Sequence, residues 1–398
     1  MKRIKHFGAL ALALVMALTA LSGCGQKNPV SSGSGSGSSS GSGSSSDAPS
    51  VSMDLSQITD PYLTVSGLAG DEVLVKVGGA EITAADYLYW LRRVIENYLA
   101  PFGGQMTTLP WDSEVSEGVT FGQQLEQDAL DAAVLHCMLR EMARQEGLTP
   151  DPSIAEDLEQ QYINMILQAD SDETQVTHIF WAQMLTKDLL LRLNENNNLY
   201  DQLANLYYGE NSGHYPTDAD VNAYLEETSQ YKCKHILLST VDDNRQPLDE
   251  ETVAQKKADA EELLSQLRAA EDPIALFDTL MNEHSEDPGL DSFPDGYTAG
   301  KGDMVAPFEQ AALALKAGEI SDIVESDFGY HIILRLPMNA DEHRDECVSY
   351  LFEKRVDEET ERLGVVKTAA FDKLDIGSFW DRSQSLLAAV QTELAAAQ

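Results

Sequence analysis

Positive charge is scarce in this 398-residue sequence. It contains 27 Lys and Arg residues against 66 Asp and Glu, which gives a formal net charge of −39 at pH 7. Because such a chain would repel nucleic-acid phosphates, the balance argues against DNA or RNA as a partner. A simpler interpretation of the acidity, which the composition leaves open, is that it provides solvated helix faces.

Cysteine is also rare, and the four that occur are Cys24, Cys137, Cys233 and Cys347. No two of them form a CxxC pair, which argues against a thioredoxin-like or thiolate metal site. If Cys24 is modified, the remaining three provide no disulfide framework. We therefore expect free thiols, and we interpret Cys233 as a packing residue rather than a nucleophile.

Long hydrophobic runs are missing after the N-terminus, so no later segment is expected to span a membrane. The basic stretch MKRIKH and the apolar stretch FGALALALVMALTA, in that order, are typical of a secretory signal peptide. The next four residues, Leu21-Ser22-Gly23-Cys24, resemble the bacterial lipobox, in which the cysteine becomes the lipidated first residue. We predict a signal peptide at 1–23 and lipidation at Cys24. The alternative is an ordinary signal peptide with an incidental cysteine.

Residues 24–66 are predicted to be a linker. The segment Ser31 to Ser46 contains only serine and glycine, which is typical of a flexible coil. At roughly 5–6 Å × √n it reaches about 20–25 Å, enough to hold a folded body off a membrane surface.

The region 67–227 is predicted to be mainly helical. Thr83 and Asp86 form a near capping box at the start of one helix, and another helix, 121–146, ends at Gly147. Its methionine-rich stripes fit either an ordinary core or a surface that adapts to client proteins. Other predicted elements are a strand at 73–77 and helices at 153–168, 174–194, 198–208 and from Thr217 to about 228.

A different pattern begins at Tyr231, where YKCKHILLST predicts a strand followed by two helices. The segment 285–308 then contains four glycines and three prolines, and a loop of this length is uncommon unless it shapes a site. A short helix near 307–315 and two strands joined at 326–329 follow. The order βαααββ predicts an α+β domain, a small sheet faced by helices.

Four segments between Tyr231 and Pro337 resemble the parvulin family of peptidyl-prolyl isomerases. They are KHILL, SEDPG, GKGDMVAPFEQAALALKAGEISDIVES and FGYHII, in that order. The resemblance covers about a quarter of the chain. With the lipobox and the flanking helices, the whole chain resembles PrsA-type foldase lipoproteins, and VLVKVGGAEITAADY is similar to the helical chaperone module of SurA-like proteins.

The resemblance implies an active site made of two histidines, a central carboxylate, a hydroxyl and an apolar cup for the proline ring. One position departs from the family pattern, because Ala299 stands where an aromatic residue is frequent. The implied residues are His235, Asp287, His331 and Ser326 for the polar network and Met304 and Phe308 for the cup.

Elementary chemistry agrees with these residue types. Rotation about an X–Pro bond has a barrier of about 20 kcal/mol, and no bond has to break to accelerate it. The site must bind the twisted amide better than the planar one, which calls for an apolar cup and a polar frame. Each histidine could instead be a satisfied core residue, and Met304 and Phe308 could be ordinary packing.

These features predict a membrane-anchored, extracytoplasmic foldase that isomerises X–Pro bonds in unfolded exported proteins, without metal or cofactor. The alternative is a holdase chaperone with an inactive parvulin-like domain, which Ala299 favours. A homodimer is left open. The predicted domains are the signal peptide 1–23, the linker 24–66, a helical chaperone domain 67–227, the inserted α+β domain 228–338, and C-terminal helices 339–398 that pack back on 67–227.

Overall fold

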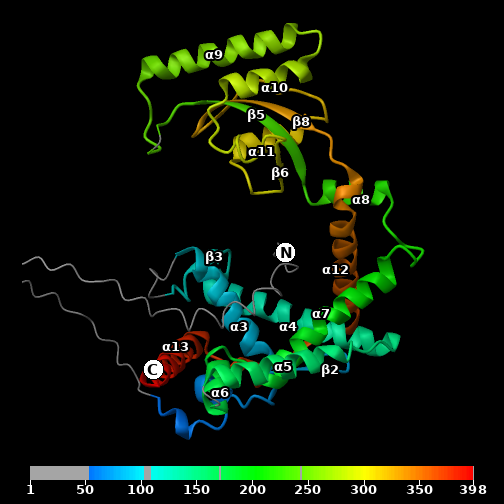
Figure 1. Cartoon of the computed structure of the whole chain (residues 1–398), viewed down its shortest axis with the longest axis vertical. Coiled ribbons are helices and arrows are strands. Elements are labelled where there is room, and N and C mark those ends of the chain that lie inside the picture. The colour runs from blue at the N-terminus through cyan, green and yellow to red at the C-terminus, as the bar shows by residue number, and fades with distance from the viewer. Residues whose placement is uncertain (1–52, 103–108, 170–171, 243, 398) are drawn as a thin grey trace, which may run out of the picture. The chain divides into compact units, whose positions relative to one another are not determined.

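The computed structural model of the chain describes residues 53–102, 109–169, 172–242 and 244–397. Cys24, the signal peptide and the Ser/Gly segment lie outside these ranges. Residues 208–351 form one compact unit, here called the sheet unit, and the described residues before 208 and after 351 form the other, called the helical unit (Figure 1). Among the described helices, none combines the length and apolar character needed to cross a bilayer.

The helical unit follows the predicted local signals closely. Thr83 and Asp86 form a complete capping box at the start of α3, and Gly147 ends α4 in the left-handed conformation. In chain order its elements are η1 (Leu55–Gln57), α2 (Pro61–Ser66), β1 (Val73–Val77), β2 (Ala80–Thr83), α3 (Ala84–Leu99), η2 (Ala100–Phe102), β3 (Glu114–Ser116), β4 (Val119–Thr120), α4 (Phe121–Glu146), α5 (Ser153–Gln168), α6 (Glu173–Ala182), α7 (Lys187–Tyr208), β9 (Val365–Lys367), η4 (Phe371–Lys373) and α13 (Ile376–Ala396).

The C-terminal segment completes the core of the helical unit. Strand β9 pairs antiparallel with β1, which also pairs with β2, and α13 packs against α2 and α6. Phe371 and Phe379 are buried there.

The division between the units falls within α12 (Arg344–Leu363), at residue 351. The sequence predicts domain limits at 228 and 338 instead. Those limits stay predictions.

The predicted boundary between two helices, 174–194 and 198–208, is wrong. The break comes earlier, between α6 and α7, where Met184 is buried with a φ of +53°. Thr186 then accepts a hydrogen bond from the backbone of Leu189 at the start of α7. The asparagine-rich stretch continues the helix, in which the Asn196 side chain is buried and bonded to His136, while the Asn194 amide donates to the Leu190 carbonyl one turn earlier.

The sequence also predicts a short extended stretch through Phe379 and Trp380 before the terminal helix, and this prediction is wrong. Both residues lie in the first turns of α13, whose N-cap Asp375 accepts a hydrogen bond from the Ser378 backbone at 2.7 Å. The extended segment of this region is β9 instead.

The sheet unit has four antiparallel strands in the order β6-β5-β8-β7. Helices α9 and α10 cover one face and α11 covers the other (Figure 1). The bounds are α8 (Asp218–Glu227), β5 (Tyr231–Ser239), α9 (Glu250–Ala269), α10 (Pro273–His284), β6 (Tyr297–Ala299), α11 (Ala306–Ala314), β7 (Val324–Ser326), β8 (Gly329–Leu336) and η3 (Ala340–His343). This confirms the predicted α+β fold class within a mostly helical chain.

Strand β6 is the element that the predicted order βαααββ lacked. It lies within the segment read as a loop and pairs with the start of β5, Cys233 opposite Tyr297. Gly296 has a φ of +93°, and a Cβ there would lie 2.5 Å from the Cys233 carbonyl oxygen. Glycine therefore allows this three-residue edge strand to approach β5.

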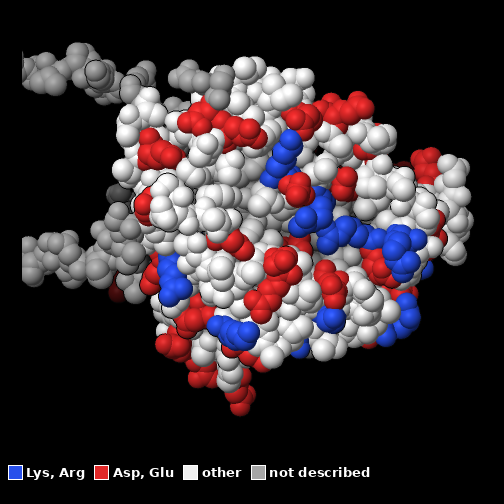
Figure 2. Space-filling model, turned by 90° about the horizontal axis from the view of Figure 1, so that it is seen from below, with Lys and Arg blue, Asp and Glu red and all other residues white. Residues whose placement is uncertain are grey.

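The acidic surface is dispersed. In the space-filling view, Asp and Glu side chains are scattered over the visible face, while Lys and Arg lie partly in a short band and partly in separate patches (Figure 2). This distribution favours the interpretation that the acidic residues provide solvated faces.

Candidate active site

Two adjacent strands bring His235 and His331 together. His235 lies on β5 and His331 on β8, and the register pairs them diagonally, with Leu237 opposite His331. Since side chains alternate across a strand, both rings point to the face covered by α11. The rings are nearly parallel, with centroids 5.4 Å apart, and their Nδ1 atoms lie 3.2 Å from each other.

Asp287 closes one end of this pair. It follows α10, and its Oδ2 lies 3.0 Å from His235 Nε2 while its Oδ1 accepts a hydrogen bond from the Gly289 backbone at 3.2 Å. Tyr297 Oη donates to the same Oδ2 at 2.6 Å. Burial acts to raise the pKa of Asp287, but the hydrogen bonds from His235 and Tyr297 outweigh it and bring this pKa down to about 2.

Ser326 closes the other end. Its Oγ lies 2.7 Å from His331 Nε2 and accepts a hydrogen bond from the Phe328 backbone at 3.1 Å. We call Asp287, His235, His331 and Ser326 the histidine network. It is continuous, because each member is within hydrogen-bonding distance of the next.

The charge states of its members decide which atoms donate and which accept hydrogen bonds along the histidine network. Burial, with His235 nearby, lowers the pKa of His331 to about 4, so His331 is neutral at pH 7. The Asp287 carboxylate can only accept, so His235 donates through Nε2–H. With a single proton, on Nε2, His235 accepts at Nδ1 from His331, and His331 Nε2 accepts from the hydroxyl of Ser326. In this form the hydrogen-bond donors all point from Ser326 towards Asp287.

A buried apolar cluster lies directly beside the histidine network. Phe308 is 2% exposed, and its ring stands nearly perpendicular to both imidazoles, 5.1 Å from His235 and 5.3 Å from His331. Met304 and the buried Ala299 pack in the same cluster. With alanine at position 299, the predicted cup for a proline ring is reduced to Phe308 and Met304, which pack together in this cluster.

The six residues predicted from the sequence thus lie in one place, four in the histidine network and two in the adjoining cluster. Their roles in catalysis stay predictions. Cys233 is buried on β5, and burial raises the pKa of its thiol to about 12, so it stays protonated and is a poor nucleophile. Within the described ranges, no group of three or more His, Cys, Asp or Glu residues could hold a metal ion.

Tyr297 is the residue that sequence reasoning missed. It lies on β6, inside the segment read as a loop, and no motif singles it out. The usable signal was the pair Gly296-Tyr297, a glycine next to a residue that favours strands.

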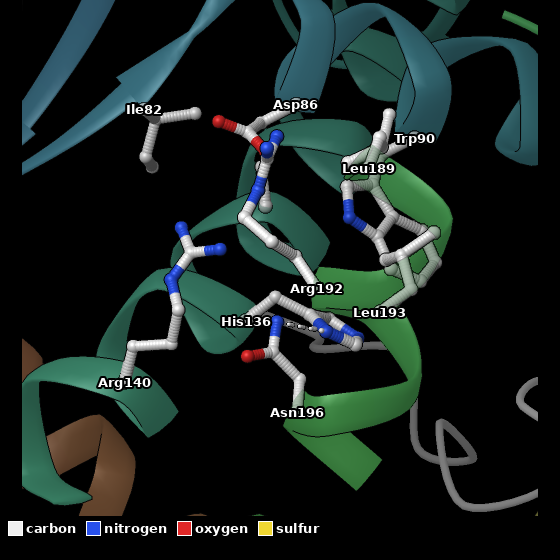
Figure 3. Close-up of a pocket in the computed structure, with 10 residues that line it drawn as sticks. Ile82, Asp86, Trp90, His136, Arg140, Leu189, Arg192, Leu193 and Asn196 are labelled. Carbon is white, nitrogen blue, oxygen red and sulfur yellow. Dashed lines mark hydrogen bonds and ion pairs between the residues drawn. The ribbon is translucent and has the colours of Figure 1, made fainter. Parts of the chain in front are cut away.

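A second polar site lies in the helical unit, between β2, α3, α4 and α7 (Figure 3). Arg192 is paired with Asp86 at 2.8 Å, and His136 Nδ1 lies 3.1 Å from the amide nitrogen of Asn196. Burial lowers the pKa of His136 to about 4, so this ring is neutral. The enclosed space is about 10 Å³, the room that one water molecule needs. Its size argues for packing rather than substrate binding.

Comparison with known proteins places a rotamase domain in the sheet unit. The family model of the rotamase, PPIC-type PPIASE domain, matches residues 235–336. The foldase protein PrsA of Halalkalibacterium halodurans is 38% identical over 123 residues, which is 30% of this chain and 31% of that protein. Peptidyl-prolyl cis-trans isomerase Pin1 of Malus domestica is 35% identical over 27% of this chain and 93% of that protein.

The first two sequence alignments with foldases cover only part of those proteins. The alignments with the first two curated foldases cover about a third of those proteins. A crystal structure of the peptidylprolyl isomerase PrsA from Bacillus cereus is 20% identical and covers 68% of this chain and 98% of that chain, with a TM-score of 0.30.

Proposed function

Because this chain belongs to the parvulin family of peptidyl-prolyl isomerases, we propose that its sheet unit catalyses the cis–trans isomerisation of X–Pro bonds. The observation that carries the proposal is the continuous histidine network with the Phe308 ring packed against both imidazoles. An ionised carboxylate, two imidazoles and a hydroxyl provide a polar frame, and Phe308 with Met304 provides the cup for the pyrrolidine ring.

The reaction requires no covalent step. Rotation about the X–Pro bond costs about 20 kcal/mol because the planar amide is stabilised by resonance. A site accelerates rotation when it binds the twisted amide more tightly than the planar one. The protonated thiol of Cys233 fits this scheme, since no nucleophile is needed. The histidine network supplies fixed dipoles that do not have to reorganise as the amide twists.

The direct test is an isomerase assay on the full chain after the signal peptide. Cis–trans exchange of an unstructured Ala-Pro peptide, followed by NMR, should become faster in proportion to protein concentration. The buried Ala299 favours a second candidate, a holdase, because it leaves the cup without a further aromatic wall. Unchanged exchange, together with suppressed aggregation of an unfolded protein, would support the holdase instead.

We also propose that the protein acts outside the cytoplasm on unfolded exported proteins, held at the membrane through lipidated Cys24. The support is the lipobox-like sequence Leu21 to Cys24 at the end of the apolar stretch, followed by the Ser/Gly segment. These residues lie outside the described structure, so the sequence alone carries this part of the proposal.

The Cys24→Ala substitution should release the protein from the membrane or block its maturation, because the acceptor of the lipid is removed. Membrane fractionation and mass spectrometry of the mature N-terminus measure the effect. Ser46→Ala, which changes the Ser/Gly segment and keeps the cysteine, should behave as wild type. A mature native N-terminus without a diacylglyceryl group would contradict the anchor.

Phosphorylation before proline should slow the reaction rather than accelerate it. The segment 239–251 reads STVDDNRQPLDEE, in which Arg245 is the single cation among five acidic residues. The Asp242 carboxylate is held in this loop by hydrogen bonds from two backbone N–H groups, those of Asn244 and Gln246. A phosphate with nearly two negative charges would meet net repulsion.

The expected loss of kcat/KM for phospho-Ser-Pro against Ser-Pro is about fivefold, corresponding to about 1 kcal/mol between unit charges near 4 Å in water. Matched peptides should be compared at low salt and again at high salt, where screening narrows the difference. A faster reaction with the phosphorylated peptide would overturn the charge argument.

A further inference from the structure

Tyr297 touches the histidine network from outside it. Its Oη donates to Asp287 Oδ2 at 2.6 Å, the same oxygen that accepts from His235 Nε2 at 3.0 Å. The Tyr297 ring also meets the His235 ring edge-on, with centroids 5.7 Å apart. One side chain therefore restrains both the carboxylate and the imidazole that the carboxylate orients.

The phenol is a donor that does not titrate in the working range. Burial and the hydrogen bond to Asp287 both raise the pKa of Tyr297 above its ordinary value. A permanent O–H donor beside Asp287 favours the ionised carboxylate over the neutral acid. An acceptor-only Asp287 in turn requires His235 to carry its proton on Nε2, which sets the direction of the whole histidine network.

The surrounding backbone is shaped to admit this contact. A Cβ at Gly289 would lie 2.1 Å from Tyr297 Oη, so the loop after Asp287 leaves room only for a residue without a side chain. Gly296 lets β6 approach β5, which brings the ring to Asp287. Phe293, itself half exposed, packs on the Tyr297 ring with centroids 4.9 Å apart.

We infer that Tyr297 is a positioning residue of this site, which holds Asp287 as a fixed acceptor and thereby fixes the His235 tautomer and the direction of the histidine network. Its effect on rate rests on the proposed isomerase function. Its effect on Asp287 does not depend on that function.

The test is Tyr297→Phe in the full chain after the signal peptide, which removes one oxygen atom and keeps the ring. With ¹³C-labelled aspartate and Asp287→Asn to assign the signal, NMR titration should show an increase of about tenfold in the proton affinity of Asp287, that is, a pKa higher by about 1. In the isomerase assay, kcat should fall about tenfold while KM changes little, because positioning acts on the twisted state.

Tyr231→Phe is the matched control. Tyr231 is a buried tyrosine on the adjacent strand β5, and its hydroxyl has no hydrogen-bond partner among the described residues. This variant should leave the Asp287 titration and the isomerase rate unchanged. A lower melting temperature for Tyr297→Phe with an unmoved Asp287 titration would show a purely structural role and overturn the inference. If the wild type has no isomerase activity, the proposed function fails, and the titration still decides the role of Tyr297.

Discussion

Replacing His235 by alanine should lower kcat/KM for an X–Pro peptide about 100-fold. His235 is the member of the histidine network that bonds both Asp287 and His331, so its loss cuts the network in the middle. A factor of 100 corresponds to about 2.7 kcal/mol in the barrier. This is in the range expected when two hydrogen-bonding groups lose their partner at about 1–3 kcal/mol each.

The control is His284→Ala. His284 lies at the end of α10, half exposed, and the carboxylate of Glu283 is 3.8 Å from it, beyond hydrogen-bonding distance. This variant should keep full activity. Circular dichroism should show that His235→Ala remains folded, since α9 and α10 pack on the opposite face of the sheet. An unchanged rate in a folded His235→Ala protein, with an active wild type, would mean that the site has been misplaced.

Local features of the fold, which depend on residues close together in the sequence, could be predicted from the sequence. The capping box of Thr83 and Asp86 and the stop at Gly147 were readable because they depend on residues within four positions of each other. His235 and His331 could be assigned to strands in the same way. Their 3.2 Å contact depends on a register across 96 residues, which the resemblance to parvulins supplied and the local pattern did not.

The missed features depend on tertiary context. The break between α6 and α7 depends on Met184 taking a left-handed conformation inside the core, which an ordinary residue adopts only when packing imposes it. Strand β6 has three residues, too few for an alternation to be visible. The pairing of β9 with β1 joins residues nearly 300 positions apart, so no local pattern could predict it.

Replacing Phe379 by alanine should destabilise the helical unit by about 3–5 kcal/mol, the usual cost of removing a buried aromatic ring. Phe379 is fully buried in the first turns of α13, the helix that closes the core against α2 and α6. Domains are typically stable by about 5–15 kcal/mol, so this loss is a large fraction of the total. The substitution lies outside the sheet unit, whose own core of β5, β8, α9 and α10 does not contain it.

The two units can be followed separately in one denaturation experiment. All four tryptophans, Trp90, Trp111, Trp181 and Trp380, belong to the helical unit, so tryptophan fluorescence reports on that unit. Phe379→Ala should shift the fluorescence midpoint to a lower denaturant concentration. Isomerase activity, which reports on the sheet unit, should be lost at the same denaturant concentration as in the wild type.

The control is Phe102→Ala, at a position 41% exposed, which should lower the free energy of unfolding by less than about 1 kcal/mol. Equal shifts in fluorescence and activity would show that the units unfold as one. An unshifted fluorescence midpoint would show that α13 does not contribute to the stability of the helical unit, contrary to the burial of Phe379.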